Sequence, residues 1–253
     1  MRAIRLKTEH LFDPVGVDFT APRLYWNCEG GRKQTAYQIV AADDSGSVLW
    51  DSGRAESAAM CAKWGGSPVE PKTKVLWKVR LWDETDSVGD WSEASFETGI
   101  ITWSAKWICG EYKVNKKERY PVDCFRKSFC AEGVKKARLY ITACGLYEAK
   151  LNGRRVGDFV RAPGITNYRK RVQYQTCDVT DLLQNGENAL TVQLADGWYR
   201  GSCGAWGLKN QYGTETKLLA QLELTLADGS VQTVATDESW EWSNDGPVRF
   251  ADN

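Results

Sequence analysis

The sequence has only one histidine, His10, and no C-x-x-C pair among its eight cysteines. A nucleophile–histidine pair needs the histidine to be close to a reactive serine or cysteine, and no such motif accompanies His10. Structural zinc sites use closely spaced cysteines and histidines, and that spacing is also missing. The sequence therefore argues against triad-type hydrolysis and indicates no metal site.

Net charge and long apolar runs are lacking as well. The 33 basic residues balance the 33 acidic residues, which argues against a nucleic-acid partner, and the basic run 169–171 is interpreted as a solvated strand edge. No apolar run approaches the roughly 18 residues of a membrane helix, so no membrane partner is expected. The first ten residues carry charge without an apolar core, so no secretory signal is indicated. We expect either a cytoplasmic protein or a piece of a longer one.

The cysteines are expected to be reduced thiols. A chain of 253 residues can bury a core without disulfides, so a disulfide framework is the less favoured alternative. The cysteines in strand-like runs should behave as small hydrophobic residues. The eight are Cys28, Cys61, Cys109, Cys124, Cys130, Cys144, Cys177 and Cys203.

What the sequence does contain is short alternating runs between turn signals, which predicts an all-β fold of two β-sandwich domains, 1–101 and 102–253. The first should resemble a fibronectin-III-like sandwich. Its longest run, 75–84, places Val75, Trp77, Val79 and Leu81 on one face. The expected strands of this domain are 24–28, 36–42, 48–52, 75–84 and 94–99.

The second domain should be jelly-roll-like. Its strand-like runs include 124–130 and 137–145, and tight turns are indicated at Asn152-Gly153 and Asp228-Gly229. Helical potential is confined to Asp178–Leu183. An Asn-Gly turn needs a positive φ, so we interpret Asn152 as structural rather than functional.

Several long motifs resemble a known family. The second domain resembles the N-terminal non-catalytic β-sandwich region of bacterial α-L-rhamnosidases over roughly residues 105–250, and the first resembles the fibronectin-III-like domain that precedes that region. The second-domain motifs are YITACGLYEAKLNGRRVGD, APGITNYRKRVQYQTCDVTDLL, NALTVQLADGWYRG and YGTETKLLAQLEL. The first-domain motifs are PRLYW, QTAYQIVAA, LWDSG, VLWKVRLWDE and WSEASFETG.

The resemblance implies a non-catalytic fragment. Such enzymes carry their catalytic carboxylates in an (α/α)₆ barrel after the β-domains, and this sequence has no such helical segment, so no catalytic residue is assigned here. The chain stops at PVRFADN without a closing turn signal, and we expect the natural protein to continue. The implied role is to brace the barrel, with binding of a rhamnosylated carbohydrate as an addition.

One loop of the second domain is the candidate ligand site. Sugars are bound by aromatic faces together with acidic, amide and guanidinium groups that hydrogen-bond their hydroxyls. These types gather in seven residues, Asp196, Trp198, Tyr199, Arg200, Trp206, Asn210 and Tyr212. The favoured alternative is that the loop packs on the sandwich or docks on the barrel. Similar β-domains can bind rhamnose with calcium, so a calcium site near Asp196 stays open.

Two other functions remain open. The chain could be a complete carbohydrate-active enzyme, although its acidic residues fall mostly at turns, where they cap backbone donors or face water. It could also be a protein-interaction module that uses the tryptophan-rich first domain. A nucleotide loop is unsupported, because GSCGAWG lacks the G-x-x-x-x-G-K pattern.

Overall fold

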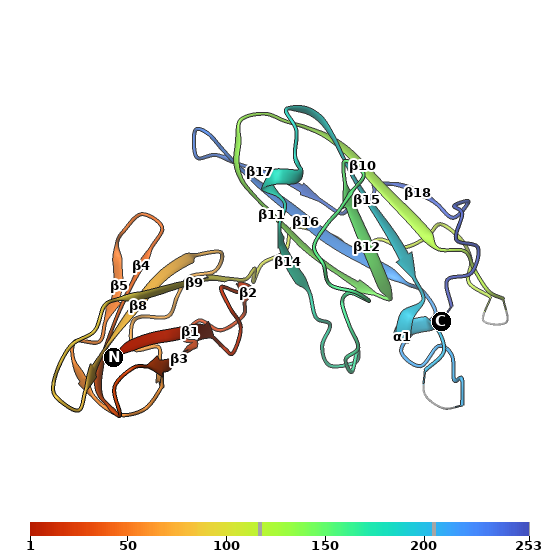
Figure 1. Ribbon diagram of the computed structural model, residues 1–253. Helices are drawn as coiled ribbons and strands as arrows, with labels where there is room; N and C mark the ends of the chain where they lie inside the picture. Colours follow the sequence, from red (N-terminus) through yellow and green to blue (C-terminus); the bar gives the residue numbers. More distant parts are fainter. Residues whose placement is uncertain (116–117, 204–205, 253) are drawn as a thin grey trace. The chain divides into compact units, whose positions relative to one another are not determined.

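The computed structural model describes residues 1–115, 118–203 and 206–252 (Figure 1). The chain folds as two compact units, Met1–Ile101 and Thr102–Asn253. Nearly all of their regular secondary structure is strand, which confirms the predicted all-β fold. All eight cysteines are free. Within the described ranges, no helix is long and apolar enough to cross a membrane.

The first unit is a two-sheet sandwich. A three-stranded sheet has the order β1-β3-β7, and the larger sheet has the order β2-β9-β8-β4-β5 with β6 beside β4. The side chains of Trp26, Trp77 and Phe96 are buried in its core. The strands are β1 (Arg2–Thr8), β2 (Val15–Val17), β3 (Arg23–Glu29), β4 (Gln34–Asp43), β5 (Val48–Asp51), β6 (Ala55–Glu56), β7 (Cys61–Lys63), β8 (Lys74–Asp83) and β9 (Ser92–Thr98).

Strand β8 follows the predicted alternation. Val75, Trp77, Val79 and Leu81 are all buried in the core of the first unit. The alternation places Trp82 on the opposite face of the strand, and it lies there outside the core cluster, yet it is also buried. The Arg54 and Arg80 guanidinium groups lie 5.0 and 5.1 Å from its ring centroid, and their stems exclude water from the indole.

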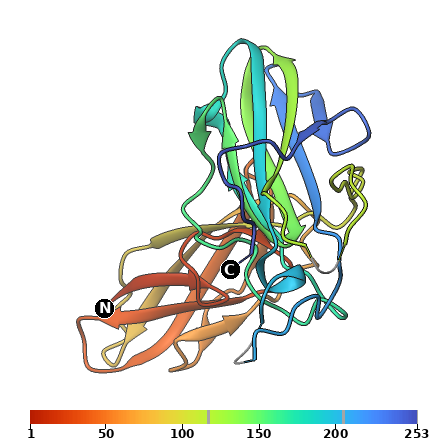
Figure 2. The same ribbon diagram turned by 90° about the vertical axis from the view of Figure 1, so that its right-hand side faces the viewer.

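The second unit is also a two-sheet sandwich, visible in both views (Figures 1 and 2). One sheet has the order β13-β12-β15-β10-β18, and the other has the order β14-β11-β16-β17. The strands are β10 (Asp123–Ala131), β11 (Val134–Cys144), β12 (Leu146–Leu151), β13 (Arg154–Arg155), β14 (Gln175–Asp178), β15 (Gly186–Ala195), β16 (Lys217–Leu226), β17 (Val231–Ala235) and β18 (Glu241–Ser243).

Strand β11 lies centrally in the four-stranded sheet and is buried on both faces. Leu139 and Ile141 face the core, as the alternation predicts. Tyr140 on the opposite face is nevertheless only 1% exposed. The Trp103 ring covers it edge-on at 6.3 Å. The segment before β10 is therefore part of the second unit's packing.

The predicted turn at Asn152-Gly153 joins β12 to β13, with φ values of 53° and 78°. The Asn152 side chain does more than permit this conformation. Its amide donates to the Leu182 carbonyl at 3.0 Å and to Asn188 Oδ1 at 2.8 Å, and its Oδ1 accepts from the Ala189 backbone N–H at 2.9 Å. This supports the structural interpretation of Asn152.

The restriction of helical structure to Asp178–Leu183 is wrong. A 3₁₀ turn, η1 (Thr180–Leu182), does lie in that range, but a short helix, α1 (Gly197–Arg200), forms inside the candidate loop. A four-residue helix is too short to produce a periodic pattern. Gly197 has φ +52°, and a Cβ there would meet Leu146 Cγ at 2.6 Å, so α1 can form here only around a glycine.

Candidate functional site

Helix α1 places two of the predicted ligand residues against each other. Asp196 is 7% exposed and Arg200 is 4% exposed. Arg200 Nε donates to Asp196 Oδ1 at 2.7 Å, and Arg200 Nη2 lies 2.5 Å from the same oxygen. Burial raises the pKa of the Asp196 carboxyl, and the Arg200 charge opposes part of that rise. The pair is turned inward and is not presented to solvent.

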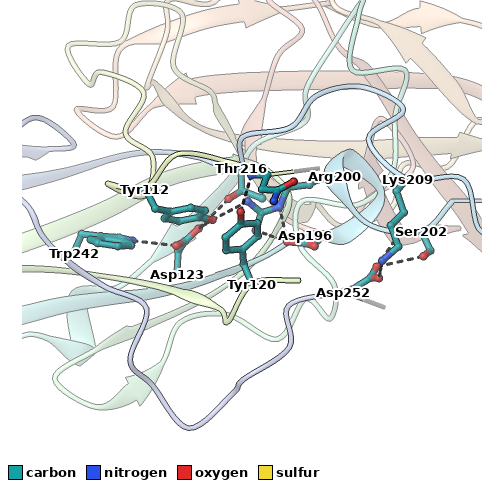
Figure 3. Close-up of polar contacts among 11 residues, drawn as sticks. Tyr112, Tyr120, Asp123, Asp196, Arg200, Ser202, Lys209, Thr216, Trp242 and Asp252 are labelled. Carbon is teal, nitrogen blue, oxygen red and sulfur yellow. Dashed lines mark hydrogen bonds and ion pairs between the residues drawn. The ribbon is translucent and has the colours of Figure 1, made fainter. Parts of the chain in front are cut away.

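Arg200 also reaches a loop far away in the sequence. Its Nη1 donates to the Tyr112 hydroxyl at 2.7 Å, and that hydroxyl donates to Asp123 Oδ2 at 3.2 Å (Figure 3). Burial raises the pKa of Tyr112 to about 12. Gly110 allows this approach, since a Cβ there would lie 2.3 Å from the Tyr112 ring. The α1 turn is thus linked to the start of β10.

Asp123 is fully buried at the centre of this network. Its Oδ2 also accepts from the Thr216 hydroxyl, and its Oδ1 accepts from Trp242 Nε1, both at 3.0 Å. Removal from water raises the pKa of the carboxyl, and these donors partly oppose the rise. The carboxylate therefore joins strands β10 and β18 to the segment before β16.

Aromatic rings surround the two charged groups. Tyr112 is stacked between Tyr120 and Trp242, with ring centroids 4.7 and 5.8 Å away. The Arg200 guanidinium carbon lies 5.3 Å from the Tyr120 ring centroid and 5.9 Å from that of Tyr112. These cation–π contacts favour the charged form of Arg200 in a site with little water. We call Tyr112, Tyr120, Asp123, Asp196, Arg200, Thr216 and Trp242 the buried polar cluster.

The remainder of the predicted loop is held by its backbone and by one ion pair. The Asn210 N–H donates to the Arg200 carbonyl at 2.9 Å, so Asn210 contributes its main chain to the turn. Lys209 Nζ pairs with Asp252 Oδ2, and the other oxygen of Asp252 accepts from the Ser202 N–H at 3.0 Å (Figure 3). The loop is therefore joined to the last described residues of the chain.

Two of the predicted tyrosines form an aromatic cluster with a neighbouring loop. Tyr168 lies 5.3 Å from Tyr199 and 5.0 Å from Tyr212 between ring centroids. Arg169 Nη2 donates to the Gln211 carbonyl at 3.3 Å. Residues 168–169 of the loop before β14 thus pack against residues 199 and 211–212 of the segment that begins with α1. Both segments lie at one end of the second unit (Figure 1).

The structure thus divides the seven predicted residues into separate groups. Asp196, Arg200 and Asn210 line a cavity of about 20 Å³, which is room for about one water molecule. Tyr199 and Tyr212 belong to the aromatic cluster, Trp198 is half-buried, and Trp206 is 87% exposed. Among the described residues, no group of three or more His, Cys, Asp or Glu side chains could hold a metal ion. Ligand binding by these residues stays a prediction.

Sequence reasoning missed the residues that complete the cluster, Tyr112, Tyr120, Asp123, Thr216 and Trp242. Asp123 begins an alternating strand, where an acidic residue is ordinarily solvent-facing. Tyr112 lies in the polar stretch 110–123, whose composition is typical of a surface loop. The only local signal is Gly110, which marks a close backbone approach without naming its partner.

Comparison with known proteins finds a matching family model for each of the two units. A family model described as the alpha-L-rhamnosidase N-terminal domain matches residues 132–253, and one described as the Rha78A-like, N-terminal immunoglobulin domain matches residues 3–102. The chain carries the N-terminal domains of the alpha-L-rhamnosidase family. Immunoglobulin and fibronectin-III domains share the two-sheet sandwich seen in the first unit.

Individual members of the alpha-L-rhamnosidase family match almost the whole chain. An alpha-L-rhamnosidase from Formosa agariphila is 34% identical over 270 residues, covering 97% of this chain and 29% of the relative. The crystal structure of an alpha-L-rhamnosidase from Aspergillus terreus has a TM-score of 0.92 at 33% identity, covering 99% of this chain and 30% of that one.

A third relative is the Streptomyces avermitilis alpha-L-rhamnosidase, solved in complex with L-rhamnose. Its TM-score is 0.90 at 25% identity, with 99% of this chain and 42% of that chain covered. The chain therefore spans about 30 to 40% of the length of these family members.

Proposed function

We propose that this chain is the N-terminal scaffold of an α-L-rhamnosidase, and that it braces a catalytic domain formed by other residues of a longer polypeptide. The relatives it matches are α-L-rhamnosidases of which it spans about 30% in the cases of highest identity. Hydrolysis of the rhamnoside bond is assigned to the part of those proteins that the chain does not cover.

The observation that carries the proposal is the internal pairing of Asp196 and Arg200. Glycoside hydrolysis usually needs two carboxyl groups on either side of a substrate, about 5 to 10 Å apart. Here the buried carboxyl groups of Asp196 and Asp123 already accept hydrogen bonds from protein donors. The cavity beside Asp196, about 20 Å³, has no room for a sugar ring. The loop therefore acts as a brace.

Apolar side chains on the two packed loops provide a surface for docking. Leu208, Phe159 and Ile165 are each more than half exposed, and Val160 and Trp206 are more exposed still. Isolated exposed apolar residues are common, but five on two adjoining segments suggest an interface. We call these five residues the loop-end surface, and we propose that it packs against the catalytic domain.

The test uses the polypeptide encoded by the complete reading frame. Leu208→Ser should lower both its melting temperature and its turnover of an aryl α-L-rhamnoside, because the docked interface loses apolar burial. The matched control is Val231→Ser on β17, which is 58% exposed against 52% for Leu208. If the two variants lost melting temperature and turnover to the same extent, docking at the loop-end surface would be contradicted.

A second function, rhamnoside binding at the candidate loop, is favoured by the exposed indole of Trp206. Exposed aromatic faces stack on the C–H surfaces of sugars. Titration of the chain with L-rhamnose, with and without calcium, should then quench tryptophan fluorescence in the wild type and not in Trp206→Ala. Absence of any heat or fluorescence change in both conditions would leave the bracing role alone.

A further inference from the structure

The five-stranded sheet of the second unit has a groove on its outward face. It has a volume of about 440 Å³ and lies over β12, β15, β10 and β18, which run side by side in Figure 1. Small-molecule clefts hold roughly 300–1,000 Å³. The groove is therefore large enough for an organic ligand, unlike the cavity beside Asp196.

Strand register sets two rows of side chains in this groove. One row runs Glu148, Gln193, Cys124 and Ser243, and the other runs Lys150, Thr191, Arg126 and Glu241. Directly opposed residues of antiparallel strands share a face, and so do residues two apart on one strand. The intervening residues Ala149, Val192 and Phe125 are buried in the core, so both rows face outward.

The charges of the groove cancel locally. Arg126 Nη1 lies 3.1 Å from Glu241 Oε2, and Lys150 Nζ lies 3.7 Å from Glu148 Oε1. Between these pairs the groove presents neutral hydrogen-bonding groups, the Gln193 amide and the Thr191 hydroxyl. The amide supplies two donors and an acceptor, and the Thr191 hydroxyl, which donates to the Lys150 carbonyl at 3.3 Å, can still accept a hydrogen bond. A polyanion finds no match here, because each cation of the groove already faces a carboxylate.

We propose that this groove binds a neutral oligosaccharide that runs across the strands. Neighbouring strands are about 4.8 Å apart, close to the span of one pyranose ring, so successive sugars would each meet a new side chain. A peptide would gain little affinity by extending the sheet, because β12, β15 and β10 lie between other strands and the edge strand β18 has only three residues. With no aromatic ring facing outward in either row, affinity should depend on the number of sugars bound.

The site is separate from the loop-end surface. Its residues lie on strands, and none of the five loop-end residues lines the groove. Loss of docking by Leu208→Ser would therefore leave the groove proposal standing, and failure of sugar binding here would leave the bracing function standing.

The test follows the side-chain amide resonance of Gln193 by NMR in the whole chain. The probes are hexasaccharides of glucose, xylose and mannose, a tetrasaccharide of α-L-rhamnose, and each monosaccharide. We expect at least one oligosaccharide to shift the resonance at lower concentration than its monosaccharide, with no dependence on salt. No response to any probe, or tighter binding of an oligogalacturonate that weakens with salt, would overturn the proposal.

Substitutions of residues that line the groove test whether the sugar binds there. Thr191→Ala, which removes one neutral hydroxyl, should weaken binding by about three- to tenfold, as expected for one hydrogen bond. Gln193→Ala should weaken it at least as much, read from backbone amide shifts of β15. The matched control is Gln232→Ala, another half-buried glutamine, on β17 of the other sheet. Equal affinity of all three variants and the wild type would refute the groove as the site.

Discussion

Arg200 on α1 donates a hydrogen bond from Nη1 to the hydroxyl of Tyr112 over 2.7 Å, although the two residues are 88 positions apart in the chain. The same guanidinium group pairs with Asp196 inside its own turn. One cation thus joins the candidate loop to the segment before β10. The loop is therefore held in the packing at the end of the sandwich, and the first prediction tests this directly.

Replacing Arg200 should destabilise the second unit strongly. Arg200→Leu leaves the buried Asp196 carboxylate without its partner, and such losses cost about 3–5 kcal/mol. The measurement is denaturant unfolding, followed separately for the transition of each unit. The matched control, Arg249→Leu, removes an exposed i,i+4 pair with Asp245. The control should leave unfolding almost unchanged. Equal effects of the two variants would show that the buried pair does not brace the fold.

Asp123 should make the stability of the second unit fall as pH rises. Because its folded pKa is raised, the folded state holds the proton at pH values where the unfolded chain has lost it. The stabilising contribution is complete below the unfolded pKa and is lost as pH rises through the folded pKa. Asp123→Asn removes this titration, so its stability relative to wild type should increase from acidic pH toward neutral.

A second variant separates titration from hydrogen bonding at Asp123. Thr216→Val removes one donor to the carboxylate and keeps the acid, so the pKa should rise further and the pH dependence should persist. The measurement is the unfolding free energy across the pH range for all three proteins. A constant difference between wild type and Asp123→Asn at every pH would contradict a raised pKa.

The Asn152 side chain should contribute beyond the turn conformation. Glycine adopts φ 53° freely, so Asn152→Gly retains the turn and deletes only the hydrogen bonds to Leu182, Asn188 and Ala189. We expect a loss of about 1–3 kcal/mol from the groups left unsatisfied. Asn185→Gly is the control, because that exposed side chain makes one long bond to Gly133. If Asn152→Gly left the free energy of unfolding unchanged, the side chain would contribute nothing beyond the turn conformation.

Gly197 should tolerate a side chain less well than Gly207. Both have positive φ, at 52° and 59°, so alanine is strained to a similar degree at each. Only at Gly197 would the new Cβ also collide, with Leu146 Cγ and with the Gly145 backbone. Gly197→Ala should therefore lower the melting temperature of the second unit more than Gly207→Ala. The reverse order would contradict the close packing of α1 on β12.

Features that depend on neighbouring residues in the sequence could be predicted, and features that depend on residues far apart in the sequence could not. Alternation in β8 and the turn at Asn152-Gly153 are local, and both were predicted correctly. The buried polar cluster was not predictable, because Tyr112, Asp123 and Arg200 meet only once the sheets are assembled. The candidate loop was located by composition, but its polar types could not reveal that Asp196 and Arg200 turn inward. Trp82 lies on its predicted face, and its burial could not be predicted because the arginines that cover it come from a different segment and from its own strand.

The division between scaffold and catalysis is tested most directly by assaying the purified 253-residue chain with an aryl α-L-rhamnoside. The account predicts release of the aryl group no faster than in buffer, because the buried carboxyl groups of Asp123 and Asp196 are engaged by protein donors. Turnover by this chain that disappears on replacing one of its aspartates or glutamates would contradict the account.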